Sequence, residues 1–178
     1  KYIGDAMMVF LGDPESKGEK EDSRACVEMA LRMQERMKEL QEKWSNEGFA
    51  DPFQVRMGIN TGYCNVGNFG SEQRLTYTII GGEVNVAQRL EASAEANGIL
   101  MSYETYAHAQ DMIDVVEREA IKMKGISREI KLFSFVKRKS KAGDKKNQIK
   151  GKPTKKELSE IEAMKKDINS LKINMQNM

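Results

Sequence analysis

The sequence predicts an α+β fold, in which helices pack on a mixed, mainly antiparallel sheet and a further helix lies at the C-terminal end. Two observations carry this prediction. Segments with strand character alternate with segments of helical periodicity, and several strand segments are joined by short glycine-containing turns typical of hairpins. The chain has 178 residues, 39% hydrophobic and 31% charged, which is typical of a globular protein with one well-packed core.

The N-terminal segment predicts a hairpin. Residues 1–3 form the end of one strand, Gly4 and Asp5 the tight turn, and residues 6–10 the returning strand. Because the chain opens within a strand and without Met, we expect its natural N-terminus to lie upstream. The longest uninterrupted apolar run, residues 6–11, is far too short to cross a bilayer.

A long amphipathic helix is predicted from Asp22 or Ser23, either of which can cap it, to about Trp44. Its apolar residues recur at steps of three or four, so they share one face, which we expect to pack on the core. They are Cys26, Ala30, Met33, Met37, Leu40 and Trp44. Cys26 and Cys64, the latter in a predicted strand, have no metal-binding spacing and are expected to be buried or half-buried thiols of a cytoplasmic protein.

The central part of the chain predicts strands and turns. Alternating apolar residues between 53 and 59 indicate a half-buried strand, and residues 63–66 and 75–80 indicate two more. Residues 67–70, with the sequence Gly-Asn-Phe-Gly, are predicted to form the loop between these last two strands.

A second helix is predicted over residues 83–96, with Gly98 as its C-terminal stop. A short strand over residues 99–101 leads to Ser102, which we expect to cap a third, short helix. Two final strands are predicted at residues 115–123 and 129–136.

The composition changes after this point, so residues 1–136 are predicted to form the folded domain. Residues 137–156 are rich in Lys and predict a basic linker, and residues 157–178 carry an apolar stripe that predicts an amphipathic helix. Thirteen Lys or Arg against five Asp or Glu give residues 137–178 a net charge of +8, so the rest of this +2 chain carries −6. A solvated linker is favoured over contact with nucleic acid or an anionic membrane, because no aromatic residues interleave the basic run.

Asn85 and Arg89 are the first candidates for chemistry. They lie four residues apart, just after a glycine pair, and so share one face of the predicted helix. An amide and a guanidinium near a helix N-terminus suit an anionic ligand such as a phosphate. Spacing alone slightly favours a structural role, in which Asn85 caps the helix and Arg89 pairs with Glu91 or Glu95. Asp5 alone predicts only a turn.

Four sequence blocks resemble the class III adenylyl and guanylyl cyclase catalytic domain, in the same order and at the same spacing. Together they cover nearly all of residues 1–136, and the four in order are far more specific than any one. The blocks are Lys1-Tyr2-Ile3-Gly4-Asp5-Ala6-Met7-Met8, Met57-Gly58-Ile59-Asn60-Thr61-Gly62, residues 74–81 (RLTYTIIG), and Val84-Asn85-Val86-Ala87 with Arg89-Leu90-Glu91. The resemblance implies the ferredoxin-like core of that family.

The resemblance further implies an adenylyl cyclase that takes ATP and works as a homodimer with composite sites at the interface. Asp5 matches one of two aspartates that hold two divalent cations, Mg²⁺ or Mn²⁺. Lys1 and Thr78 match the pair that reads adenine. Asn85 matches the asparagine that orients the ribose, and Arg89 the arginine on the phosphates during the reaction.

The chemistry of the family fits these side chains. One metal activates the 3′-hydroxyl, which attacks the α-phosphorus in line, and the other steadies the leaving pyrophosphate. A fixed guanidinium at Arg89 would stabilise charge that develops on phosphate oxygens. Lys1 can donate to N1 of adenine, whereas N1 of guanine carries a proton and would need a Glu there, so ATP is favoured over GTP.

The sequence departs from the family pattern at three places, one of which, Gly82-Glu83 instead of the more usual Asp-Thr, is expected to be tolerated. The first metal aspartate of the family lies on an earlier strand that this sequence does not contain, so we expect the chain by itself to have little or no activity. The phosphate-contacting lysine follows a Lys-Gly pair in the family, where this sequence has Ile126. Lys124 is the candidate substitute, and a solvated surface lysine is an equal alternative.

Two other functions stay open. A guanylyl cyclase is disfavoured by Lys1 and Thr78. A catalytically inactive cyclase-like module for dimerisation or regulation is disfavoured by the retained Asp5, Asn85 and Arg89.

Overall fold

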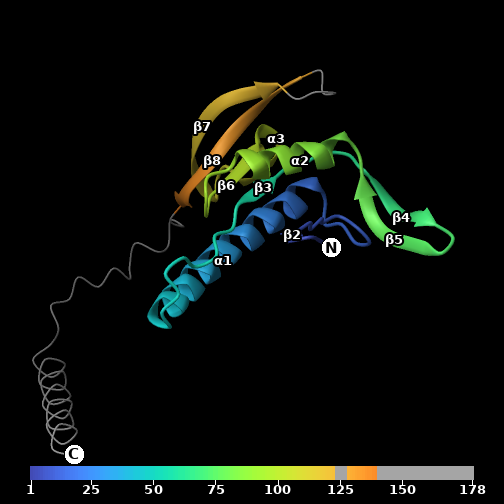
Figure 1. Ribbon diagram of the computed structural model, residues 1–178. Coiled ribbons are helices and arrows are strands. Elements are labelled where there is room, and N and C mark those ends of the chain that lie inside the picture. Colours follow the sequence, from blue (N-terminus) through green and yellow to red (C-terminus); the bar gives the residue numbers. More distant parts are fainter. Residues whose placement is uncertain (123–127, 140–178) are drawn as a thin grey trace, which may run out of the picture. The chain divides into compact units, whose positions relative to one another are not determined.

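The computed structural model describes residues 1–122 and 128–139 (Figure 1). Lys124, most of the predicted linker and the predicted helix at residues 157–178 lie outside the described residues. No helix in the described part is both long and apolar enough to cross a membrane. The elements are β1 (Tyr2–Ile3), β2 (Ala6–Met7), α1 (Glu19–Asn46), β3 (Met57–Ile59), β4 (Asn65–Ser71), β5 (Arg74–Ile80), α2 (Gly82–Ser93), β6 (Ile99–Ser102), α3 (Tyr103–Ala109), β7 (Ile113–Lys122) and β8 (Glu129–Arg138).

The described strands form one four-stranded sheet and two separate hairpins. The order in the sheet is β3-β6-β8-β7. β3 runs parallel to β6, with Met57 beside Ile99, whereas β6 and β7 both run antiparallel to β8. The hairpins β1–β2 and β4–β5 are antiparallel. The predicted α+β fold with a mixed, mainly antiparallel sheet is therefore confirmed.

Helices cover both faces of the four-stranded sheet. Successive residues of a strand point to opposite faces, so Ile99 and Met101 of β6 pack with α1 and α3, while Leu100 packs with α2. The first cluster contains Val27, Ala30, Leu31, Ile59, Ile99, Met101, Ala109, Ile113 and Phe133. The second contains Val86, Leu90, Leu100, Ile130 and Leu132.

The long helix α1 begins earlier than predicted, at Glu19, and turns a partly different stripe to the core. Its N-terminal cap is Gly18, with no side-chain capping bond. Val27 and Leu31 are buried beside the predicted Ala30, whereas the predicted Met33, Met37, Leu40 and Trp44 are only partly buried. The periodicity identifies a broad apolar face, but the packing partners decide which part of that face is covered.

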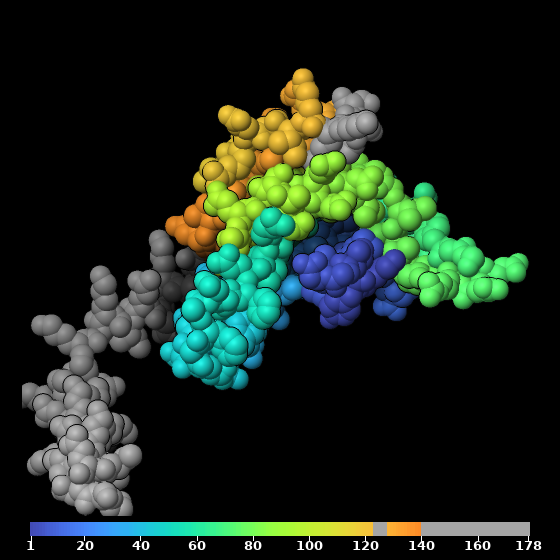
Figure 2. Space-filling view, in the orientation of Figure 1, coloured from blue at the N-terminus to red at the C-terminus, as the bar shows by residue number. Residues whose placement is uncertain are grey.

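The hairpin β4–β5 is longer than predicted. Its strands pair from Asn65 with Ile80 to Ser71 with Arg74, so the predicted loop at residues 67–70 is wrong and the turn falls at residues 72–73. Gly70 makes this possible, because its φ is +141° and a Cβ there would stand 1.9 Å from the Arg74 carbonyl oxygen. In the space-filling view the hairpin, in green, stands out beyond the four-stranded sheet (Figure 2).

Other predicted elements change in length. The strand expected over residues 53–59 shortens to β3, and the returning strand at residues 6–10 shortens to β2. Phe53 is 77% exposed and packs edge-on against Trp44, with ring centroids 5.7 Å apart. The predicted cap of the third helix is confirmed, because the Ser102 side chain accepts a hydrogen bond from the Thr105 amide.

The two cysteines differ in environment. Cys26 is half-buried on α1, as predicted, and burial raises the pKa of its thiol. Cys64 precedes β4 and is exposed, so its predicted place in a strand and its predicted burial are both wrong.

Candidate functional site

Helix α2 presents Asn85 and Arg89 on its exposed face. Both residues are exposed, while Val86 and Leu90, each one position further along, are fully buried against the sheet. The spacing of four residues therefore places the amide and the guanidinium on one side of the helix. The N-cap position is Gly81 and no side chain caps the helix, so Asn85 does not serve as its cap.

Arg89 is not engaged by the carboxylates that its sequence neighbourhood offers. Glu91 pairs with Arg56 at 2.9 Å, and Glu95 pairs with Arg118 at 3.1 Å. Within residues 1–122 and 128–139, Arg89 forms no ion pair with any carboxylate. The structural role that spacing alone favoured is thus not the one observed, and the guanidinium is free for an anionic ligand.

The close packing of α2 on the sheet depends on Gly58 of β3. A Cβ at Gly58 would stand 2.2 Å from the amide nitrogen of Glu91 and 2.4 Å from the carbonyl oxygen of Ala87. Backbone atoms cannot swing aside as a flexible side chain can, so glycine alone permits this approach. The middle of the helix, which carries Arg89, therefore rests directly on β3.

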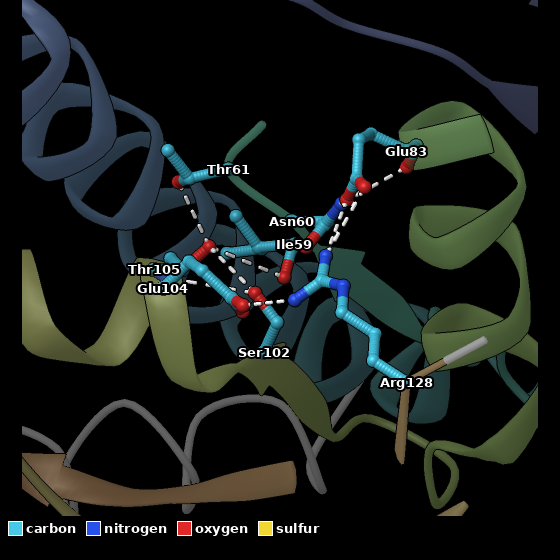
Figure 3. Close-up of polar contacts among 8 residues, drawn as sticks. All are labelled: Ile59, Asn60, Thr61, Glu83, Ser102, Glu104, Thr105 and Arg128. Carbon is cyan, nitrogen blue, oxygen red and sulfur yellow. Dashed lines mark hydrogen bonds and ion pairs between the residues drawn. The ribbon is translucent and has the colours of Figure 1, made fainter. Parts of the chain in front are cut away.

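A polar cluster holds the N-terminal end of α2 (Figure 3). Asn60, just after β3, donates through Nδ2 to the carboxylate of Glu83 at 2.8 Å and to the Glu83 carbonyl oxygen at 3.0 Å. Arg128 donates through Nη2 to both Glu83 carboxylate oxygens, at 3.1 and 3.0 Å, and through Nη1 to Glu104 of α3. A Cβ on Gly62 would lie 2.6 Å from Cγ of Glu83, so this side chain fills the space that Gly62 leaves.

Charge and burial act in opposite directions on Arg128. Partial burial alone would lower its pKa, but hydrogen bonds to Glu104 and Glu83 outweigh burial, and the pKa is raised above its ordinary value. The guanidinium is therefore held in its charged form by two carboxylates.

Hydroxyl groups continue this polar region toward the other face of the sheet. Thr61 contacts Ser23 of α1 at 2.9 Å and Thr105 of α3 at 3.0 Å, measured between side-chain oxygens. Ser23 and Thr105 are buried. Mutually bonded hydroxyls can be buried without leaving polar atoms unsatisfied, so these contacts extend the polar region into the core beside the end of β3.

The predicted base-reading residues lie on the two hairpins. Thr78 of β5 is only 7% exposed, opposite Gly67 of β4, whereas Lys1 is exposed. The ring centroids of Phe10 and Tyr77 lie 6.2 Å apart, so the N-terminal segment packs beside the residue that precedes Thr78. The structure thus brings the segment that carries Lys1 to the strand that carries Thr78.

Asp5 lies at the predicted turn of β1–β2, after Gly4 with φ 62°, and is exposed. A carboxylate is the ligand type that Mg²⁺ and Mn²⁺ prefer. Over the residues that the structure describes, however, no three His, Cys, Asp or Glu side chains gather into a metal-binding group. Among the described residues, Asp5 is therefore not part of a preformed group of metal ligands.

Sequence reasoning did not find the cluster around Glu83. Glu83 and Arg128 are 45 residues apart, so no local periodicity links them. The one available signal is that Gly82-Glu83 replaces the Asp-Thr that is more usual in the resembling family. Lys124, the candidate phosphate contact, lies outside the described residues.

Comparisons with known proteins agree on one family. Residues 1–137 match the model of the adenylate and guanylate cyclase catalytic domain. Among solved structures, the adenylyl cyclase CyaB from P. aeruginosa superposes with a TM-score of 0.73 at 47% identity, covering 77% of this chain and 70% of that one. The guanylyl cyclase Cya2 superposes with a TM-score of 0.64 at 28% identity, covering 74% of this chain and 66% of that one.

Two curated adenylate cyclases are also similar to this chain. Adenylate cyclase 1 of Rhizobium meliloti (strain 1021) is 30% identical over 76% of this chain, and an adenylate cyclase of Mycobacterium bovis is 31% identical over 70% of it. The chain spans only 20% and 26% of the lengths of these two relatives. The fold, the placement of the matched motifs and these similarities together show the family. The chain belongs to the class III adenylate and guanylate cyclase catalytic-domain family.

Proposed function

We propose that the domain is an adenylyl cyclase, which converts ATP into 3′,5′-cyclic AMP and pyrophosphate in signal transduction. The observation that carries this proposal is the exposed guanidinium of Arg89 beside Asn85, on a helix whose opposite side is fully buried. A cation held in place by the scaffold stabilises charge that develops during a reaction, because it need not reorganise as water must. Among the described residues no carboxylate neutralises it.

In the proposed reaction the 3′-hydroxyl of ATP attacks the α-phosphorus and pyrophosphate leaves. Negative charge moves onto phosphate oxygens in the transition state, where Arg89 donates hydrogen bonds to them. The amide of Asn85 orients the ribose so that the hydroxyl lies in line with the leaving group. Lys124 is proposed as a further phosphate contact on the resemblance alone.

The choice of ATP over GTP is assigned to Lys1 and Thr78. A lysine ammonium donates to the N1 acceptor of adenine, and a threonine hydroxyl can accept from the 6-amino group. Guanine reverses both positions, because its N1 carries a proton and its C6 carries a carbonyl, so a buried mismatch would be costly. The 47% identity to an adenylyl cyclase, against 28% to a guanylyl cyclase, supports this assignment.

We propose a homodimer whose sites are shared between subunits. In it, Asp5 contributes a ligand to divalent cations, Mg²⁺ or Mn²⁺, in the site that the partner subunit completes with Arg89, Asn85, Lys1 and Thr78. Bound cations would supply activation of the 3′-hydroxyl and charge neutralisation. The family generally uses divalent metals, and the lone carboxylate at Asp5 is the reason to expect little activity from this chain by itself. A cytoplasmic location of the domain, with or without a membrane anchor elsewhere in the protein, is part of the proposal, because its proposed substrate ATP is abundant inside cells.

The test is a product assay with the chain and with the form extended by its upstream reading frame. Cyclic nucleotide is measured from ATP and from GTP, with Mg²⁺ or Mn²⁺, in wild type and Arg89→Ala. Cyclic AMP from the extended form, lost by about 100-fold or more in the variant, is expected. Cyclic GMP as the main product would instead assign a guanylyl cyclase, and a folded dimer without product would assign an inactive regulatory module.

A further inference from the structure

We propose that Arg128 is a positioning residue of this site, which fixes the first turn of α2 and thereby the side chains of Asn85 and Arg89. Its effect on catalysis rests on the proposed cyclase function, while its effect on the helix rests on the geometry around Glu83 alone. No sequence motif carries this assignment, because the cluster forms between distant segments.

Arg128 joins three elements at one end of the sheet. It stands immediately before β8, whereas Glu83 and Glu104 lie in the first turns of α2 and α3. These two helices cover opposite faces of the sheet. One guanidinium therefore ties both helix N-termini to the strand between them (Figure 3). The planar fork of arginine suits two carboxylates at once, which the point charge of a lysine does not.

Glu83 is restrained from several directions. Arg128 engages both of its carboxylate oxygens, and Asn60 engages its side chain and its backbone carbonyl together. Gly62 provides the space in which the side chain lies. Asn60 Oδ1 is buried and accepts no hydrogen bond from the described residues, so the amide is oriented for Glu83 at the expense of its own oxygen.

The cluster is too accessible to act mainly through stability. The side chains of Arg128, Glu83 and Glu104 are 43%, 27% and 35% exposed. Ion pairs of this accessibility contribute little to the free energy of unfolding. Their contribution is geometric. Because they join three different elements, they fix the N-terminal end of α2 in one orientation.

The position of the cluster explains why orientation matters. Asn85 and Arg89 follow Glu83 on the same helix, and Gly58 holds the helix again beneath Ala87. With the N-terminal contacts removed, α2 would keep its seat at Gly58 but its first turn would be free to shift. A displacement of about 1 Å in a reacting group can lower a rate by about 100-fold.

The test compares Arg128→Ala with a matched variant in the cyclase assay of the extended form. We expect kcat for ATP to fall about ten- to 100-fold, with KM within about threefold and the thermal midpoint little changed. The control is Arg118→Ala, which removes an arginine about as exposed as Arg128, at 47%, from its ion pair with Glu95, beyond the C-terminal end of α2. Its kcat should stay near that of wild type. Equal losses in the two variants would overturn the proposal.

A second comparison shows whether Arg128 acts through Arg89. In an Arg89→Ala background, Arg128→Ala should lower kcat by less than it does in wild type, because only Asn85 is then left to be positioned. Losses that multiply in the double variant would contradict a positioning role. Arg128→Lys keeps the charge but cannot bind both carboxylates, so its kcat should lie between those of wild type and Arg128→Ala. This variant also tests the proposal if Arg128→Ala fails to fold.

A third measurement needs no activity. Hydrogen–deuterium exchange of the amides at residues 82–88 should be faster in Arg128→Ala, with α1 unchanged, and unaltered exchange would sink the proposal. If the extended wild type forms no cyclic nucleotide, the proposed function fails while exchange still decides the role of Arg128. If wild type is active and Arg128→Ala behaves like it, only the positioning role fails.

Discussion

Arg138, the last residue of β8, holds Glu28 of α1 with both terminal nitrogens of its guanidinium. Nη1 donates to Oε2 at 2.6 Å and Nη2 to Oε1 at 3.3 Å, across 110 residues of sequence. Nε donates in addition to Glu35 at 3.0 Å. Arg138 falls within residues 137–156, the predicted basic linker, yet it belongs to a strand and ties that strand to the long helix.

Acid should weaken the contact between Glu28 and Arg138. Hydrogen bonds from Arg138 and then Arg32 lower the pKa of Glu28 below 4.5, although burial opposes them. The folded protein therefore binds fewer protons than the unfolded chain in this range, so the stabilisation is complete above about pH 4.5 and is lost as the pH falls through the folded-state pKa. Thermal unfolding should show that the Tm of wild type exceeds that of Glu28→Gln at pH 7, and that this advantage in Tm shrinks as the pH falls to 3. An advantage that grew would contradict this assignment.

Gly58→Ala should destabilise the domain. The added Cβ would stand 2.2 Å from a backbone nitrogen of α2, so the helix must move off the sheet. Overpacking of this kind costs about 1–3 kcal/mol, which denaturant unfolding can measure. Gly82→Ala is the matched control, because nothing lies within 4 Å of a Cβ there. If both variants are as stable as wild type, the close approach of α2 is not as described.

Two inactive variants should restore one another if sites are shared. In a mixture of Asp5→Ala and Arg89→Ala chains of the extended form, half of the dimers are mixed. Each mixed dimer keeps one intact site, so the mixture should regain about a quarter of wild-type cyclic AMP formation.

Each variant by itself provides the control and should be nearly inactive. Size-exclusion chromatography of the mixture confirms that dimers form. No gain over the separate variants, in a mixture that is shown to exchange subunits, would rule out composite sites.

In the extended form, Lys1→Glu should shift nucleotide preference toward GTP. A glutamate can accept the N1 proton of guanine but has no proton for N1 of adenine, so the ratio of kcat/KM for ATP over GTP should fall by about tenfold or more. Lys17→Glu makes the same charge change at another exposed lysine of the N-terminal segment and should leave the ratio unchanged. An unaltered ratio in Lys1→Glu would remove Lys1 from the base-reading pair.

The sequence predicted what depends on local patterns and motifs. The fold class, the helix that carries Asn85 and Arg89, and the cap at Ser102 follow from periodicity, spacing and capping chemistry, and all are observed. The full length of the β4–β5 hairpin was not predicted, because Gly67 and Gly70 are typical of a loop and here lie within a paired strand.

Long-range contacts could not be predicted from the sequence. Val27 and Leu31, instead of Met33, are buried in the core because that side of α1 packs with residues of α3 and β3. The pair formed by Glu83 and Arg128 has the same origin. Both arise from how distant elements pack, and a single sequence carries no local trace of such contacts.

β5 ends at Ile80 and α2 begins at Gly82, so only Gly81 separates the strand that carries Thr78 from the helix that carries Asn85 and Arg89. Residues proposed for different tasks are thus encoded by one short stretch of gene. Recombination between related genes at residues 74–89 would transplant Thr78, Asn85 and Arg89 together, while the recipient kept its own residues at the positions of Lys1 and Asp5, its own scaffold and its own regulation.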